Sequence, residues 1–113
     1  MGISRAELSN LIETIFTEVQ STREAGQKEY ARESNNAFAN FERIGGLLHK
    51  TREEILMVYL LKHMDGIVSW VEGHKSQRED VTGRITDAIT YLCLLWGMTL
   101  KDTEQQTMGD EVI

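Results

Sequence analysis

Three ionisable side chains interrupt an otherwise apolar segment at residues 59–70, YLLKHMDGIVSW. Lys62, His63 and Asp65 lie within four positions of one another, and at helical spacing His63 continues the apolar stripe of the segment. One interpretation is structural: a hydrogen-bonded core histidine beside a lysine whose charged end reaches solvent. The alternative is a polar site built into the interior of the domain.

A second set of polar side chains follows at residues 84–91. Arg84, Asp87 and Tyr91 are spaced three and four positions apart, and this places them on one side of a helix. Apolar residues share that side, so a carboxylate there is costly unless it is paired. We expect Lys62, His63 or Arg84 to pair with Asp87.

Asn40, in the segment FANFER, adds an amide to these groups. Cations suit phosphate, an amide suits the edge of a base, and a tyrosine suits stacking or a ribose hydroxyl. We therefore predict a site for a phosphate or nucleobase. Its ligand-binding residues are Asn40, Lys62, His63, Arg84, Asp87 and Tyr91. No catalytic residue can be assigned.

Metal and cofactor motifs are missing from the sequence. There is no HExxH or CxxC pattern and no glycine-rich phosphate loop. We predict no metal site, with Asp65 and Asp87 as the weak alternative for Mg²⁺ under an enzymatic function. The single cysteine, Cys93, lies in an apolar segment and is predicted to be a small core residue.

Composition favours one all-α domain. The chain has 113 residues with no proline, and its net charge of −6 argues against direct nucleic-acid binding. The longest apolar run has seven residues, too few to cross a membrane. We expect a single helical domain over residues 1–100, a flexible acidic tail over 101–113, and a cytoplasmic location.

Three Ser/Thr-x-x-Glu patterns mark helix starts at Ser4, Thr51 and Ser76. The apolar periodicity predicts a compact bundle of four to five helices. Their ranges are about 5 to the mid-twenties, 36–48, 52–71 for a buried central helix, and 80–98 for a long last helix. Two helices with wide apolar surfaces exceed what a monomer of this size can bury, so a homo-oligomer is expected.

Segments EYARESNNAFANFERIGGLL, EEILMVYLLKHMDGIVSW and VTGRITDAITYLCLL resemble a small helical family found mainly in bacteriophages, a nucleotide-modification-associated domain. The resemblance spans about residues 28–98, and its matching residues are Tyr30, Asn40, Phe41, Lys62, His63, Asp87 and Tyr91. The chain is also distantly similar to MazG-type all-α nucleoside triphosphate pyrophosphohydrolases. Their ExxE and ExxD metal pairs are incomplete here, since Arg84 stands where a glutamate is required.

Three functions are compatible with these observations. One is a phage-type protein that binds a nucleotide between the central and last helices. Another is an anti-defence or regulatory protein that contacts a host protein or sequesters a signalling nucleotide, in the host cytoplasm if it is phage-encoded. The third, less favoured, is a Mg²⁺-dependent nucleoside phosphate hydrolase.

Overall fold

Four helices follow one another along the chain in the computed structural model: α1 (Arg5–Tyr30), α2 (Ala39–Leu48), α3 (Arg52–Val71) and α4 (Val81–Val112). The structure describes residues 2–30, 35–75 and 78–112, and the side chains of 2–29, 35–75 and 78–100. Within these ranges there is no strand, which confirms the all-α prediction. No helix there is long and apolar enough to cross a membrane.

Local capping signals explain where two of these helices begin. The Ser4 hydroxyl accepts a hydrogen bond from the Glu7 backbone N–H at 3.1 Å. Thr51 and Glu54 form a reciprocal capping box at the start of α3. In the third pattern, Ser76 lies outside the described residues. There α4 begins at Val81, directly after Asp80.

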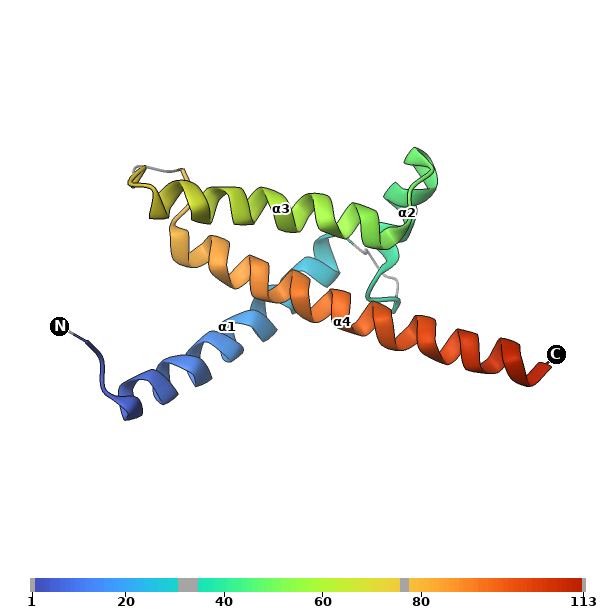
Figure 1. Ribbon diagram of the computed structural model, residues 1–113, viewed down its shortest axis with the longest axis horizontal. Coiled ribbons are helices and arrows are strands. Elements are labelled where there is room, and N and C mark those ends of the chain that lie inside the picture. Colours follow the sequence, from blue (N-terminus) through green and yellow to red (C-terminus); the bar gives the residue numbers. More distant parts are fainter. Residues whose placement is uncertain (1, 31–34, 76–77, 113) are drawn as a thin grey trace.

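The helices α3 and α4 run antiparallel and side by side (Figure 1), and they form the most extensive helix pair. A short α2 packs near the start of α3, while α1 crosses α4 at an angle and extends away from the other helices (Figure 1). The last helix continues to Val112, beyond the predicted end near residue 98. Flexibility of the tail over 101–113 stays a prediction.

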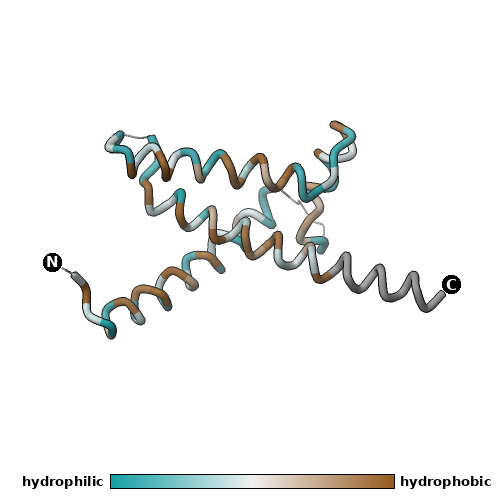
Figure 2. The backbone as a smooth tube through the Cα atoms, viewed as in Figure 1, coloured by the Kyte–Doolittle hydropathy of each residue, from teal (hydrophilic) through white to brown (hydrophobic). Residues whose placement is uncertain are grey.

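The core lies where α2, α3 and α4 meet. Its buried members are Phe41, Ile55, Leu56, Leu94 and Met98, and two of these, Leu56 and Met98, are completely buried. The burial of α3 is one-sided. Hydrophilic and hydrophobic residues alternate along this helix (Figure 2), and some apolar residues lie on its exposed side, where Val58 is 65% exposed.

A tight turn connects α2 to α3 and fixes the angle between them. His49 closes α2 in the left-handed conformation at φ 55°, and the Lys50 N–H donates to the Gly45 carbonyl at 2.9 Å. The returning chain passes so close that a Cβ on Gly45 would lie 2.6 Å from the Lys50 carbonyl oxygen. Glycine at this position therefore permits the close approach of the turn to α2.

Candidate ligand-binding pocket

A pocket of about 650 Å³ opens between the second half of α1 and the helices α2, α3 and α4. Five of the six predicted ligand-binding residues line it: Asn40, Lys62, His63, Asp87 and Tyr91. They come from three helices, and the crossing of α1 closes the pocket from a fourth side. The structure thus brings these five residues to one pocket.

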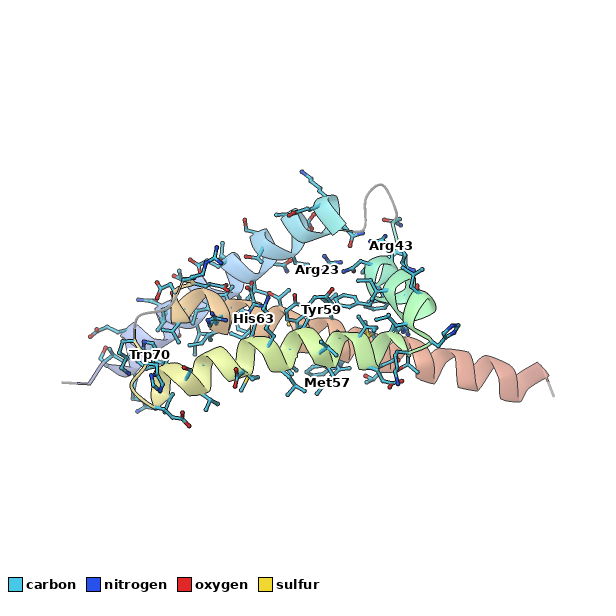
Figure 3. The ribbon with its side chains drawn as sticks, turned by 90° about the horizontal axis from the view of Figure 1, so that it is seen from above. Arg23, Arg43, Met57, Tyr59, His63 and Trp70 are labelled. Carbon is cyan, nitrogen blue, oxygen red and sulfur yellow. The ribbon has the colours of Figure 1, made fainter. Side chains whose placement is uncertain are left out.

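Aromatic rings form the inner wall of the pocket. Tyr59 and Tyr91 lie nearly parallel, with ring centroids 6.0 Å apart, and Phe41 meets both rings edge-on. The imidazole of His63 follows at 5.5 Å from the Tyr91 ring. Seen from above, Tyr59 and His63 lie on the side of α3 toward α1, opposite to Met57 (Figure 3).

Arg23 is a pocket residue that the sequence reasoning missed. Its guanidinium donates to the Ala37 carbonyl at 2.9 Å and to the Gln27 side chain, so it joins α1 to the segment before α2 (Figure 3). Burial lowers the pKa of Arg23, and the charge of Glu24 opposes that effect. One signal was available: Arg23 continues the stripe of Ile15 and Val19 at a spacing of four residues.

Lys62 on α3 and Asn40 on α2 both line the pocket. Lys62 is exposed to solvent. Asn40 is half-buried in the first turn of α2. The pocket therefore combines an accessible cation with an amide that the fold holds in place.

His63 and Asp87 lie together at the junction of α3 and α4. Their closest atoms, Nδ1 and Oδ2, are 3.7 Å apart, which is an ion-pair distance and too long for a hydrogen bond. His63 is only 9% exposed, and its Nδ1 atom has no hydrogen-bond partner among the residues that the structure describes. Of the three cations predicted to pair with Asp87, His63 lies at ion-pair distance from it.

Glu79 completes this group from the residues that precede α4. Burial raises the pKa of Asp87 above its ordinary value, His63 opposes the rise, and the hydrogen bond and charge of Glu79 add to it. One ligand atom from each of His63, Glu79 and Asp87 lies within 4.8 Å of the others. This grouping was not predicted, because Glu79 is the last residue of the Ser76 capping pattern and was assigned only to that pattern.

Arg84 and Asp65 lie apart from the pocket. The Arg84 side chain lies across Gly66, where an added Cβ would be 2.5 Å from its Cδ, and its Nη1 atom is 3.9 Å from Glu79. Asp65 is exposed on α3. The structure thus groups Asp87 with Glu79 and His63, and not with Asp65.

The prediction for Cys93 was wrong. Its side chain is exposed, and it borders a smaller depression of about 240 Å³ between α1 and α4. The core face of α4 instead contains Leu94 and Met98, and Cys93 lies beside that face. Apolar neighbours in the sequence do not determine which face of a helix packs into the core.

Comparison with known proteins adds no assignment: no protein-family model, curated protein or solved structure matches this chain.

Proposed function

We propose that this chain binds a nucleotide or a nucleotide-derived ligand in the pocket between α1, α2, α3 and α4. The observation that carries the proposal is one pocket that combines the Lys62 ammonium, the Asn40 amide and two tyrosine rings. Its volume of about 650 Å³ lies within the range of roughly 300–1,000 Å³ for sites that enclose small organic ligands.

Each of these side chains suits a different part of a nucleotide. Lys62, which is exposed to solvent, is placed to contact a phosphate that remains partly hydrated. Asn40 offers both a donor and an acceptor to the edge of a base. The Tyr59 and Tyr91 rings provide flat apolar surface and hydroxyl groups for the base and sugar.

The charge of the pocket wall favours a ligand of mixed character. Lys62 and Arg23 are cationic, whereas Asp87 and Glu29 are acidic, and all four line the same pocket. A free phosphate would be attracted by the two cationic side chains and repelled by the two acidic ones. A nucleotide presents an anionic end together with hydroxyl and amino donors, so it can satisfy both pairs.

The resemblance to phage nucleotide-modification domains supports the same class of ligand. It also supports the anti-defence alternative, in which the pocket sequesters a signalling nucleotide in the cytoplasm of an infected host. The hydrolase alternative requires turnover. Chromatography of nucleoside triphosphates after incubation with the protein and Mg²⁺ distinguishes the hydrolase alternative from sequestration. A sequestered nucleotide is recovered intact, whereas a hydrolysed one is not.

Thermal unfolding with a panel of mono-, tri- and cyclic nucleotides, with and without Mg²⁺, tests binding directly. A nucleotide at about 100 times its Kd stabilises the folded state by about 2.7 kcal/mol. Loss of a charge-assisted hydrogen bond costs about 1.5–3 kcal/mol, so Lys62→Met should weaken binding by about tenfold or more. Lys50→Met, which removes an exposed lysine outside the pocket, should leave affinity unchanged. If no nucleotide raises the unfolding temperature, the proposal is wrong.

A second proposal concerns association with a protein, and exposed apolar side chains favour it. Leu8, Leu11, Ile12 and Phe16 follow one face of α1, and Leu92 and Trp96 follow a face of α4; Trp96 is 72% exposed. We infer that these faces contact a second copy of the chain or a host protein. Sedimentation velocity tests the homo-oligomer: a monomer at all concentrations would exclude it.

A further inference from the structure

We propose that His63, Glu79 and Asp87 form a binding site for a divalent first-row transition-metal ion at the edge of the pocket. The three side chains converge although they are distant in sequence. His63 comes from α3, Asp87 comes from α4, and Glu79 comes from the residues before α4. One nitrogen and two carboxylate oxygens lie within 4.8 Å of one another.

The first observation that indicates a ligand is the His63 Nδ1 atom. It is buried, directed at Asp87 across 3.7 Å, and without a hydrogen-bond partner among the described residues. A buried polar nitrogen left in this state costs about 1–3 kcal/mol. A metal ion between the two side chains would satisfy that nitrogen. The 3.7 Å separation is slightly longer than the roughly 3.3–3.6 Å between neighbouring ligands of a tetrahedral ion, so a small approach of the two side chains would complete the contact.

The second observation is the pair of carboxylates beside this nitrogen. Glu79 and Asp87 each have a carboxylate oxygen within 4.8 Å of the other, and like charges repel at such a distance. A divalent cation removes that repulsion. Arg84 lies near the same pair, with its Nη1 atom 3.9 Å from Glu79 and its side chain over Gly66.

The donor set indicates which ions fit. Mg²⁺ and Ca²⁺ favour oxygen ligands throughout, whereas imidazole together with carboxylates suits Zn²⁺, Mn²⁺, Fe²⁺ or Co²⁺. Three protein ligands leave coordination positions open. Because His63 and Asp87 also line the pocket, an ion here would be accessible from the pocket to water or to an anionic group of a ligand.

Titration of the chelator-treated full chain with Co²⁺ alone tests the site. The visible absorption of bound Co²⁺ and the metal content after dialysis report binding, and about one ion per chain is expected. Glu79→Gln should weaken binding by about 100-fold or more, since loss of outer-shell partners alone costs 10–100-fold. Glu72→Gln, an exposed carboxylate elsewhere, should bind Co²⁺ as the unmodified chain does.

The histidine ligand has its own matched pair. His63→Gln should lose the Co²⁺ absorption. His49→Asn should keep it, because it removes an exposed imidazole away from the site, at a left-handed position that asparagine tolerates. Circular dichroism checks folding, and Glu79→Gln keeps the test decisive if His63→Gln does not fold, because Glu79 lies outside the core cluster.

Retention of no metal by the unmodified chain, or equal affinity in Glu79→Gln and Glu72→Gln, would overturn the proposal. The titration contains no nucleotide, so its outcome is independent of the nucleotide proposal.

Discussion

The adjacent glycines Gly45 and Gly46 in α2 allow a direct test of the close contact between α2 and the turn that leads to α3. A Cβ on Gly45 would lie 2.6 Å from the Lys50 carbonyl oxygen, whereas a Cβ on Gly46 would meet no atom within 4 Å. The contact on Gly45 is with backbone and cannot be relieved by rotating a side chain. Gly45→Ala and Gly46→Ala are therefore the same substitution in neighbouring positions, and they differ in the steric overlap with the Lys50 carbonyl oxygen.

The magnitudes follow from that difference. In a helix, alanine is favoured over glycine by about 0.5–1 kcal/mol, so Gly46→Ala should stabilise the protein by about that amount. Gly45→Ala has the same gain, but overpacking against the turn costs about 1–3 kcal/mol. We expect the free energies of unfolding to differ by about 1–3 kcal/mol, which corresponds to at least roughly 4 °C in unfolding temperature.

Urea unfolding followed by circular dichroism measures both variants, with thermal unfolding as a second probe. Equal m-values would show that the two transitions expose the same surface, so that midpoints can be compared directly. If Gly45→Ala is as stable as Gly46→Ala, the turn is not held by close approach to Gly45. In that case the placement of Asn40 and Phe41 beside α3 would require another explanation.

Two further predictions concern the core and the helix start. Leu56→Ala, at a completely buried position, should destabilise the protein by about 2–5 kcal/mol in urea unfolding, whereas Val58→Ala on the exposed face should change it by no more than about 0.5 kcal/mol. Hydrogen bonds from Thr51 lower the pKa of Glu54, so its stabilisation is complete above the unfolded-state pKa and is lost as the pH falls through the folded-state pKa. Glu54→Gln should therefore make the unfolding temperature depend less on acid pH than Glu13→Gln does, and identical pH profiles would contradict this.

Local features of the sequence predicted much of the fold. The patterns at Ser4 and Thr51 satisfy backbone N–H groups within one turn, so they mark helix starts whatever the rest of the chain does. The helical spacing of His63 and Asp87 likewise placed both on inward faces. Each of these inferences depends on residues three or four positions apart.

Features that depend on how helices cross were not predictable in this way. Arg23 lines the pocket because α1 passes beside the segment that precedes α2, and Glu79 comes close to His63 because α4 runs back alongside α3. Arg84 has the spacing of a pocket residue, yet Gly66 leaves room for it to lie flat against α3. These outcomes depend on contacts between residues that are distant in sequence, which periodicity does not encode.

The pocket also occupies space that a tightly packed helical bundle would fill with side chains. Here α1 packs mainly against α4, while the pocket separates its second half from Tyr59 and Lys62 on α3. A bound ligand would then take the place of missing core atoms and join two helices that the protein itself holds together only loosely. Under the proposed function, the free chain gives up packing stability to keep this space open, as in proteins whose binding sites are less stable than their cores could be. Saturation with a nucleotide that binds in the pocket should then raise the cooperativity of unfolding, with α1 melting together with the other helices.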